Sequence, residues 1–209
     1  MNYIIFDLEW NQSPEGKSGS DERMPFEIIE IGAVRLNEKR EKTGEFQTLI
    51  KPQVYKWIHD SIRSVVHVDY KDLMSGATFP QAIRDFLDWC GEDFVFCTWG
   101  MQDLTELQRN LRYYDLLELL PGPVTYYDIQ KLFSWFHENM KLRRSLEYAV
   151  DTLGIRKEKG FHRALEDAEY TAEVFCRLDM SEILPYYSVD TYQAPKNKKQ
   201  EIYISYPAY

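Results

Sequence analysis

The sequence predicts an α/β fold in which three antiparallel strands are joined by parallel ones, with helices on both faces of the sheet. Apolar runs at 3–10, 26–34 and 46–50 follow one another with short connections, which indicates an antiparallel meander. Short strands are expected at 94–97 and 125–128, each leading into a helical pattern. The wholly apolar run at 94–97 is typical of a buried parallel strand.

The length of 209 residues suits one domain, or one domain with a small appendage. We expect the domain at 1–180 and an extension at 181–209, where tyrosines lie among prolines and a small lysine cluster. These tyrosines would either pack on the domain or stack on nucleic-acid bases.

The apolar runs are far shorter than a membrane span, and no secretory leader precedes the first strand. We therefore expect a cytoplasmic protein with no membrane partner. The cysteines Cys90, Cys97 and Cys176 form no close pair, so buried thiols in a reducing compartment are expected.

The first strand carries two carboxylates within an apolar run. Because side chains alternate along a strand, Asp7 and Glu9 project to one face while Phe6, Leu8 and Trp10 point to the other. Paired carboxylates on a buried strand are costly to desolvate unless a cation or water reaches them. At this point a metal site and a wet edge strand are both open.

Other unusual polar residues are ambiguous when taken singly. Asp103 follows a strand and opens a helix, where an acid is often only a cap or a dipole partner. Glu30, inside a buried run, is either a partner of the site or a structural glutamate. His59 and His67 are interpreted as surface or packing residues.

The helical patterns have clear limits. One helix is expected to begin at Pro80 and to end at Gly91, and the last is expected to run from near Phe161 to about Leu178 with Cys176 facing the core.

His162 and Asp167 are five residues apart and would diverge by about 140° on a regular helix. To serve one site, His162 must come from the loop before the last helix and Asp167 from its first turns.

The formal net charge of -9 is unusual for a protein that grips long nucleic acid through its backbone. Between residues 141 and 163, however, the sequence contains seven Lys or Arg and three acids, a local excess of four positive charges. This segment is either a local basic patch or a solvated helical surface.

Five polar residues together, in their order along the chain, resemble the motifs of the DEDDh group of 3'-to-5' exonucleases, which includes proofreading exonucleases, ribonuclease T and oligoribonuclease. They are Asp7, Glu9, Asp103, His162 and Asp167. The spacing from His162 to Asp167 is similar to that of the histidine branch, and the stretches at 27–34 and 145–155 are also family-like. The resemblance covers residues 1–180 and implies a ribonuclease H-like fold with a mixed five-stranded sheet flanked by helices.

The sequence departs from the proofreading enzymes at two places. Trp10 stands where they usually carry threonine, and Thr98-Trp99-Gly100 replaces their asparagine-containing lead into the second motif. Both features look closer to the subgroup that trims RNA 3' ends in histone-message and RNA-interference pathways. RNA is therefore favoured over DNA as the substrate.

The resemblance implies a phosphodiester hydrolase with two Mg²⁺ or Mn²⁺ ions, which all-oxygen ligand sets suit. Asp7 would bridge two ions about 4 Å apart, with Glu9 and Asp167 completing the first site. Asp103 would support the second ion through water, and His162 would take the proton from the attacking water. The product would be a nucleoside 5'-monophosphate from the 3' end of single-stranded RNA or DNA.

Substrate binding is assigned to Leu8, Trp10, Trp99, Arg143, Arg144 and Arg163. Two other functions stay open. One is a proofreading subunit tethered to a polymerase, and the other is a catalytically silent nucleic-acid or protein-binding module on the same fold.

Overall fold

The structure is a computed structural model that describes residues 1–58, 68–139, 141–181, 183 and 185–188. Its six strands are β1 (Asn2–Asn11), β2 (Glu27–Leu36), β3 (Lys42–Leu49), β4 (Phe94–Thr98), β5 (Val124–Asp128) and β6 (Tyr186–Ser188). The helices are α2 (Tyr70–Met74), α3 (Phe79–Cys90), α4 (Gln102–Tyr113), α5 (Ile129–His137), α6 (Leu146–Thr152) and α7 (Ala164–Arg177). Single 3-10 turns occur at Gly16–Gly19 and Leu117–Leu119.

The strands form one mixed sheet in the order β3-β2-β1-β4-β5-β6. β1, β2 and β3 are antiparallel neighbours, whereas β4 and β5 run parallel to β1. The predicted five-stranded α/β sheet is therefore confirmed. β6, which the sequence did not predict, comes from the extension and pairs antiparallel with β5.

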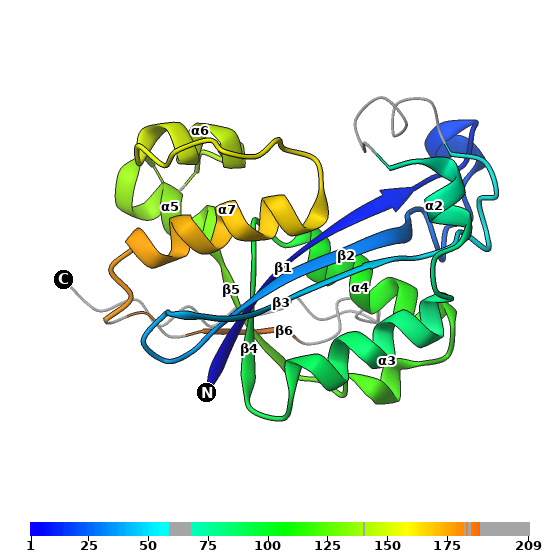
Figure 1. Ribbon diagram of the computed structural model, residues 1–209, viewed down its shortest axis with the longest axis horizontal. Coiled ribbons are helices and arrows are strands. Elements are labelled where there is room, and N and C mark those ends of the chain that lie inside the picture. Colours follow the sequence, from blue (N-terminus) through cyan, green and yellow to red (C-terminus); the bar gives the residue numbers. More distant parts are fainter. Residues whose placement is uncertain (59–67, 140, 182, 184, 189–209) are drawn as a thin grey trace, which may run out of the picture.

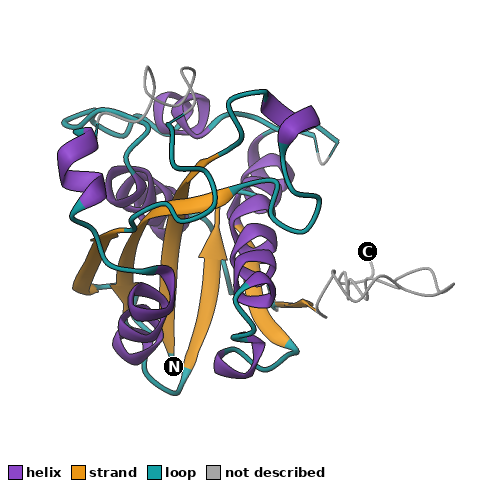
Figure 2. Ribbon diagram, turned by 90° about the vertical axis from the view of Figure 1, so that its right-hand side faces the viewer, coloured by secondary structure: helices purple, strands orange, loops and turns teal. Residues whose placement is uncertain are grey.

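Helices cover both faces of this sheet. Figure 1 shows α5, α6 and α7 on one side and α3 and α4 on the other, and Figure 2 shows the twisted sheet between the two layers. Alternate side chains of β1 enter different cores: Phe6 packs with α3 and α4, while Ile5 packs with α5, α6 and α7. The first strand thus lies at the centre of the molecule.

Helix ends mostly follow the predicted signals. Pro80 lies in the first turn of α3, and Gly91 ends that helix with a φ of 80°, which glycine adopts without strain. α7 begins at Ala164, later than predicted, because His162 has a φ of 70° and cannot belong to a right-handed helix.

Several smaller predictions have different outcomes. Cys90 and Cys97 are buried, but Cys176 is exposed, so its predicted core position is wrong. It directly follows buried Phe175, and a rotation of about 100° turns it away from the core. His59 and His67 lie outside the described residues. Among the helices that are described, none is long and apolar enough to cross a membrane.

Candidate active site

β1 supplies the first two acids of the site. Phe6 and Leu8 are buried in the core with α3 and α4, so Asp7 and Glu9 project toward α7. β1 is hydrogen-bonded to β2 on one side and to β4 on the other. The alternative of a wet edge strand is therefore wrong.

Asp167 joins these two acids from the first turns of α7. One carboxylate oxygen from each of Asp7, Glu9 and Asp167 lies within 4.8 Å of the others, and we call these three residues the acidic cluster. The Oδ1 atom of Asp167 is buried and has no hydrogen-bond partner among the described residues. A buried oxygen in this state is stabilised by a cation or a proton.

Asp103 approaches from the other side, at the beginning of α4. Its Oδ1 accepts a hydrogen bond of 3.1 Å from the backbone N–H of Leu8, which lies between the two acids of β1. Asp103 is 5% exposed. The contact reaches across to the sheet, so Asp103 does more than interact with its own helix terminus.

His162 lies in the loop immediately before α7 and is exposed. Its backbone N–H donates a 3.1 Å hydrogen bond to Oδ2 of Asp167. Burial raises the pKa of Asp167, and this hydrogen bond and the charge of His162 partly offset that rise. The predicted arrangement, with the histidine in the loop and the acid in the first turns of the helix, is confirmed.

The electrostatics of the site follow from packing acids together. Burial raises the pKa of Glu9 to about 8, that of Asp103 to about 7 and that of Asp167 to about 6. Burial, with repulsion from the neighbouring carboxylates, raises the pKa of Asp7 well above its usual range. Deprotonating these groups together therefore requires compensating positive charge.

The donor chemistry fits a hard divalent cation. The ligand atoms of the acidic cluster are all carboxylate oxygens, the ligands that Mg²⁺ and Mn²⁺ prefer. The unpaired, buried Oδ1 of Asp167 and the raised pKa values fit a site in which a cation would balance the carboxylates. Within the described part of the chain, Asp7, Glu9 and Asp167 are thus the group that could hold a metal, with Asp103 beside them.

Gly32 is a site residue that the sequence analysis missed. It pairs directly with Asp7 across the β1–β2 ladder, and a Cβ atom there would lie 2.0 Å from the backbone nitrogen of Leu165. Only glycine lets the start of α7 approach the sheet this closely. An isolated glycine inside an apolar strand is the signal that could have identified it.

Four of the six predicted substrate-binding residues form two pairs. Leu8 is buried and Trp10 packs on Phe26, both at β1 next to the acidic cluster. Trp99 and Arg144 are brought together, because the indole N–H of Trp99 donates a 3.2 Å hydrogen bond to the Arg144 carbonyl.

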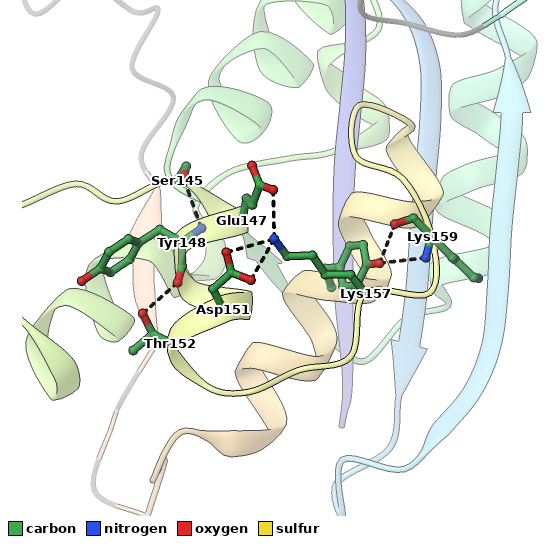
Figure 3. Close-up of polar contacts among 8 residues, drawn as sticks. Ser145, Glu147, Tyr148, Asp151, Thr152, Lys157 and Lys159 are labelled. Atoms are coloured by element: carbon green, nitrogen blue, oxygen red, sulfur yellow. Dashed lines mark hydrogen bonds and ion pairs between the residues drawn. The ribbon is translucent and has the colours of Figure 1, made fainter.

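Positive charges in the segment 141–163 are extensively paired within the protein. Figure 3 shows Lys157 between Glu147 and Asp151 of α6. The other pairs are Arg143 with Asp128, Arg144 with Glu138, Arg156 with Glu158, Lys159 with Glu169, and Arg163 with Glu30. The segment is therefore closer to a solvated, paired surface than to a patch of free cations.

Comparisons with known proteins agree with this geometry. A family model for exonucleases (RNase_T) matches residues 4–175, which include all five polar residues of the site. DNA polymerase III subunit epsilon of Aquifex aeolicus is 25% identical over 195 residues, covering 93% of this chain and 88% of that protein. The human 3'-5' exoribonuclease 1 is 22% identical over 173 residues, covering 78% of this chain and 49% of that protein.

Solved structures share the fold. The nuclease domain of 3'hExo, a DEDDh family member bound to rAMP, has a TM-score of 0.71 at 22% identity, covering 84% of this chain and 90% of that one. The Mg²⁺ and Mn²⁺ bound form of S. pombe Pop2p has a TM-score of 0.64 at 16% identity, covering 86% of this chain and 83% of that one. The chain therefore belongs to the exonuclease family (RNase_T) and has the ribonuclease H-like fold of its DEDDh members.

Proposed function

We propose that the protein is a metal-dependent 3'-to-5' exonuclease that releases nucleoside 5'-monophosphates from single-stranded nucleic acid, with RNA favoured over DNA. The observation that carries this proposal is the acidic cluster, in which one oxygen of each carboxylate lies within 4.8 Å of the others, although β1 and α7 are far apart in the sequence. A structural role would not require acids to be packed at such an electrostatic cost.

Asp7, Glu9 and Asp167 would hold Mg²⁺ or Mn²⁺, and Asp103 would support a second ion. When bound, two such ions stabilise the attacking and leaving oxygens of a phosphodiester during in-line displacement. The hydrogen bond from the Leu8 amide orients Asp103 toward β1. The metal-bound forms in solved relatives, such as Pop2p, support this ion choice.

His162 is proposed as the general base that accepts the proton of the attacking water. The hydrogen bond from its amide to Asp167 keeps its backbone beside the acidic cluster, while its exposed side chain stays accessible to substrate. Histidine suits this role because its usual pKa lies near neutral pH.

The substrate strand would enter past the backbone of Leu8 to Trp10 and near Trp99. Arg143 is 47% exposed and pairs with Asp128 only at 3.7 Å, so it can turn to a phosphate at low cost. Arg144 lies over the Tyr148 ring, 4.5 Å from the ring centroid, and would contact phosphate by exchanging its 3.3 Å ion pair with Glu138. An enzyme that holds only the last few nucleotides needs few such contacts, which reconciles this activity with the net charge of -9.

The test is digestion of one oligonucleotide sequence, prepared as 5'-labelled RNA and as DNA, with Mn²⁺, Mg²⁺ or chelator. We expect a descending ladder from the 3' end that needs metal and that is faster on RNA. A folded protein that leaves both substrates intact in the presence of either metal would instead favour the silent binding module.

A second candidate is a proofreading exonuclease associated with a polymerase. The observation in its favour is the 25% identity to DNA polymerase III subunit epsilon over 93% of this chain. The two candidates differ in substrate. Faster removal of a mismatched DNA primer end than of single-stranded RNA would support proofreading.

A further inference from the structure

Glu30 lies on the face of the sheet that carries the acidic cluster. It stands directly opposite Glu9 in the antiparallel β1–β2 pair, and directly opposed residues project to the same face. Glu30 is 0% exposed. Two like charges in this relation are destabilising unless a cation balances one of them.

Arg163 supplies that cation from the beginning of α7. Its Nη2 lies 3.0 Å from one carboxylate oxygen of Glu30, and its Nε lies 3.2 Å from the other. Gln47 of β3 donates a third hydrogen bond, 2.7 Å long, to the same carboxylate. A two-pronged pair of this kind fixes orientation as well as distance.

The ion pair affects the site because Arg163 lies between the histidine loop and the first turn of α7. Arg163 follows His162, and its carbonyl accepts a 2.9 Å hydrogen bond from the backbone N–H of Asp167. Gly32 lies two residues after Glu30 on β2. Because it has no Cβ atom, Ala164 and Leu165 at the start of α7 can approach the sheet closely. One ion pair therefore ties the histidine loop and the first turn of α7 to the strand beside β1.

We propose that Arg163 is a positioning residue, which through its ion pair with Glu30 holds the start of α7 against the acidic cluster. This assignment differs from the substrate contact that the sequence suggested, because the guanidinium is engaged by a fully buried carboxylate. The pair also offsets charge, because the Arg163 guanidinium balances the Glu30 carboxylate that stands opposite Glu9. The inference rests on the proposed function for its catalytic consequence, but the positioning itself is testable without turnover.

The test compares Glu30→Gln, Arg163→Gln, the double variant and Arg163→Lys, which keeps the charge needed for folding but loses the two-pronged contact. Arg156→Gln is the matched control, since Arg156 is 86% exposed in the same basic segment and pairs with exposed Glu158. The first readout is amide hydrogen exchange of residues 160–168 in metal-free protein. We expect faster exchange in all four site variants and no change in the control, because the His162 amide loses its fixed partner.

The second readout is exonuclease kinetics at saturating Mn²⁺. We expect kcat to fall by about 10²-fold in each site variant, with KM unchanged and with no further loss in the double variant. Unchanged exchange at 160–168 would overturn the proposal whether or not the protein is active. A raised KM with a salt slope reduced by about 1 in the Arg163 variants alone would overturn it too, by showing a phosphate contact. An inactive wild type with the expected exchange pattern would refute only the proposed function.

Discussion

His162 is the exposed member of the five polar residues of the site, and its backbone N–H donates a hydrogen bond to Asp167 of the acidic cluster. His162→Ala should lower turnover by about 10²- to 10⁴-fold, the usual contribution of a general base. Mn²⁺ affinity, measured by calorimetry, should be nearly unchanged, because the cluster supplies carboxylate ligands only.

His137→Ala is the matched control, since His137 is exposed on α5 and stacks on Phe133. It should leave both turnover and Mn²⁺ binding at wild-type values. Loss of Mn²⁺ affinity in His162→Ala would show that the histidine is a ligand and would contradict its assignment as a base.

Individual residues of the site were predictable where their chemistry is rare. Two acids on one face of an apolar strand, and a histidine five residues before an acid, are visible without a structure. The partner of Glu30 was not visible, because Arg163 lies 133 residues away and only folding brings them together. For the same reason the sequence could not show that most positive charges between 141 and 163 are paired.

At the scale of elements, the site depends on how closely α7 approaches β2. Gly32→Ala would place a Cβ atom 2.0 Å from the Leu165 nitrogen, a contact with rigid backbone that cannot relax locally. We expect the free energy of unfolding to fall by about 1–3 kcal/mol, the usual cost of overpacking. Mn²⁺ affinity should fall as well, because the displaced α7 would move Asp167 away from Asp7 and Glu9.

Gly44→Ala, in β3, controls for the general effect of a strand glycine. A Cβ atom there would come no closer than 3.4 Å to the Arg35 side chain, so both properties should stay near wild type. Thermal unfolding and Mn²⁺ calorimetry on the two variants test this prediction. Equal behaviour of the variants would mean that the approach of α7 to β2 does not organise the site.

The strands and helices that pattern predicted well are those with strong periodicity or clear end signals, such as α3 with Pro80 and Gly91. β6 could not be predicted, since three residues are too few to show a period. The start of α7 was placed too early because the apolar pattern continues to Phe161, while the backbone conformation of His162 does not. The local backbone conformation of His162 overrides the hydrophobic pattern there.

At the scale of the whole molecule, the acidic site makes stability depend on pH. An unfolded glutamate has a pKa of about 4.3, whereas burial raises the pKa of Glu9 to about 8 in the fold. Between these values the folded state binds more protons than the unfolded state, so this contribution to stability is lost as pH rises. In chelator, wild type should therefore lose more thermal stability between pH 5 and pH 8 than Glu9→Gln does.

Divalent metal should reverse that trend. Mn²⁺ competes with protons for the same carboxylates, so it should raise the Tm of wild type more at pH 8 than at pH 5. Thermal unfolding of wild type and Glu9→Gln, with chelator or Mn²⁺ at the two pH values, gives all the comparisons. A wild type whose metal-free stability rises with pH relative to Glu9→Gln would contradict the buried, uncompensated state of Glu9.

The α/β class and the combination of three antiparallel strands with parallel ones were predictable, because connection lengths and apolar runs constrain the topology. How Asp103 is held in the site was not predictable. The Oδ1 atom of Asp103 accepts a hydrogen bond from the backbone N–H of Leu8, and this contact arises only once α4 packs on the sheet.

The most direct test of the central claim is a calorimetric titration of Mn²⁺ into wild type, Asp7→Asn and Asp88→Asn at pH 8. Asp7 belongs to the acidic cluster, whereas Asp88 is exposed on α3 and serves as the matched control. We predict that wild type and Asp88→Asn bind Mn²⁺ with the same affinity and that Asp7→Asn loses at least about tenfold, or about 1.4 kcal/mol. Equal Mn²⁺ affinity in all three proteins would contradict the assignment of the acidic cluster as the metal site.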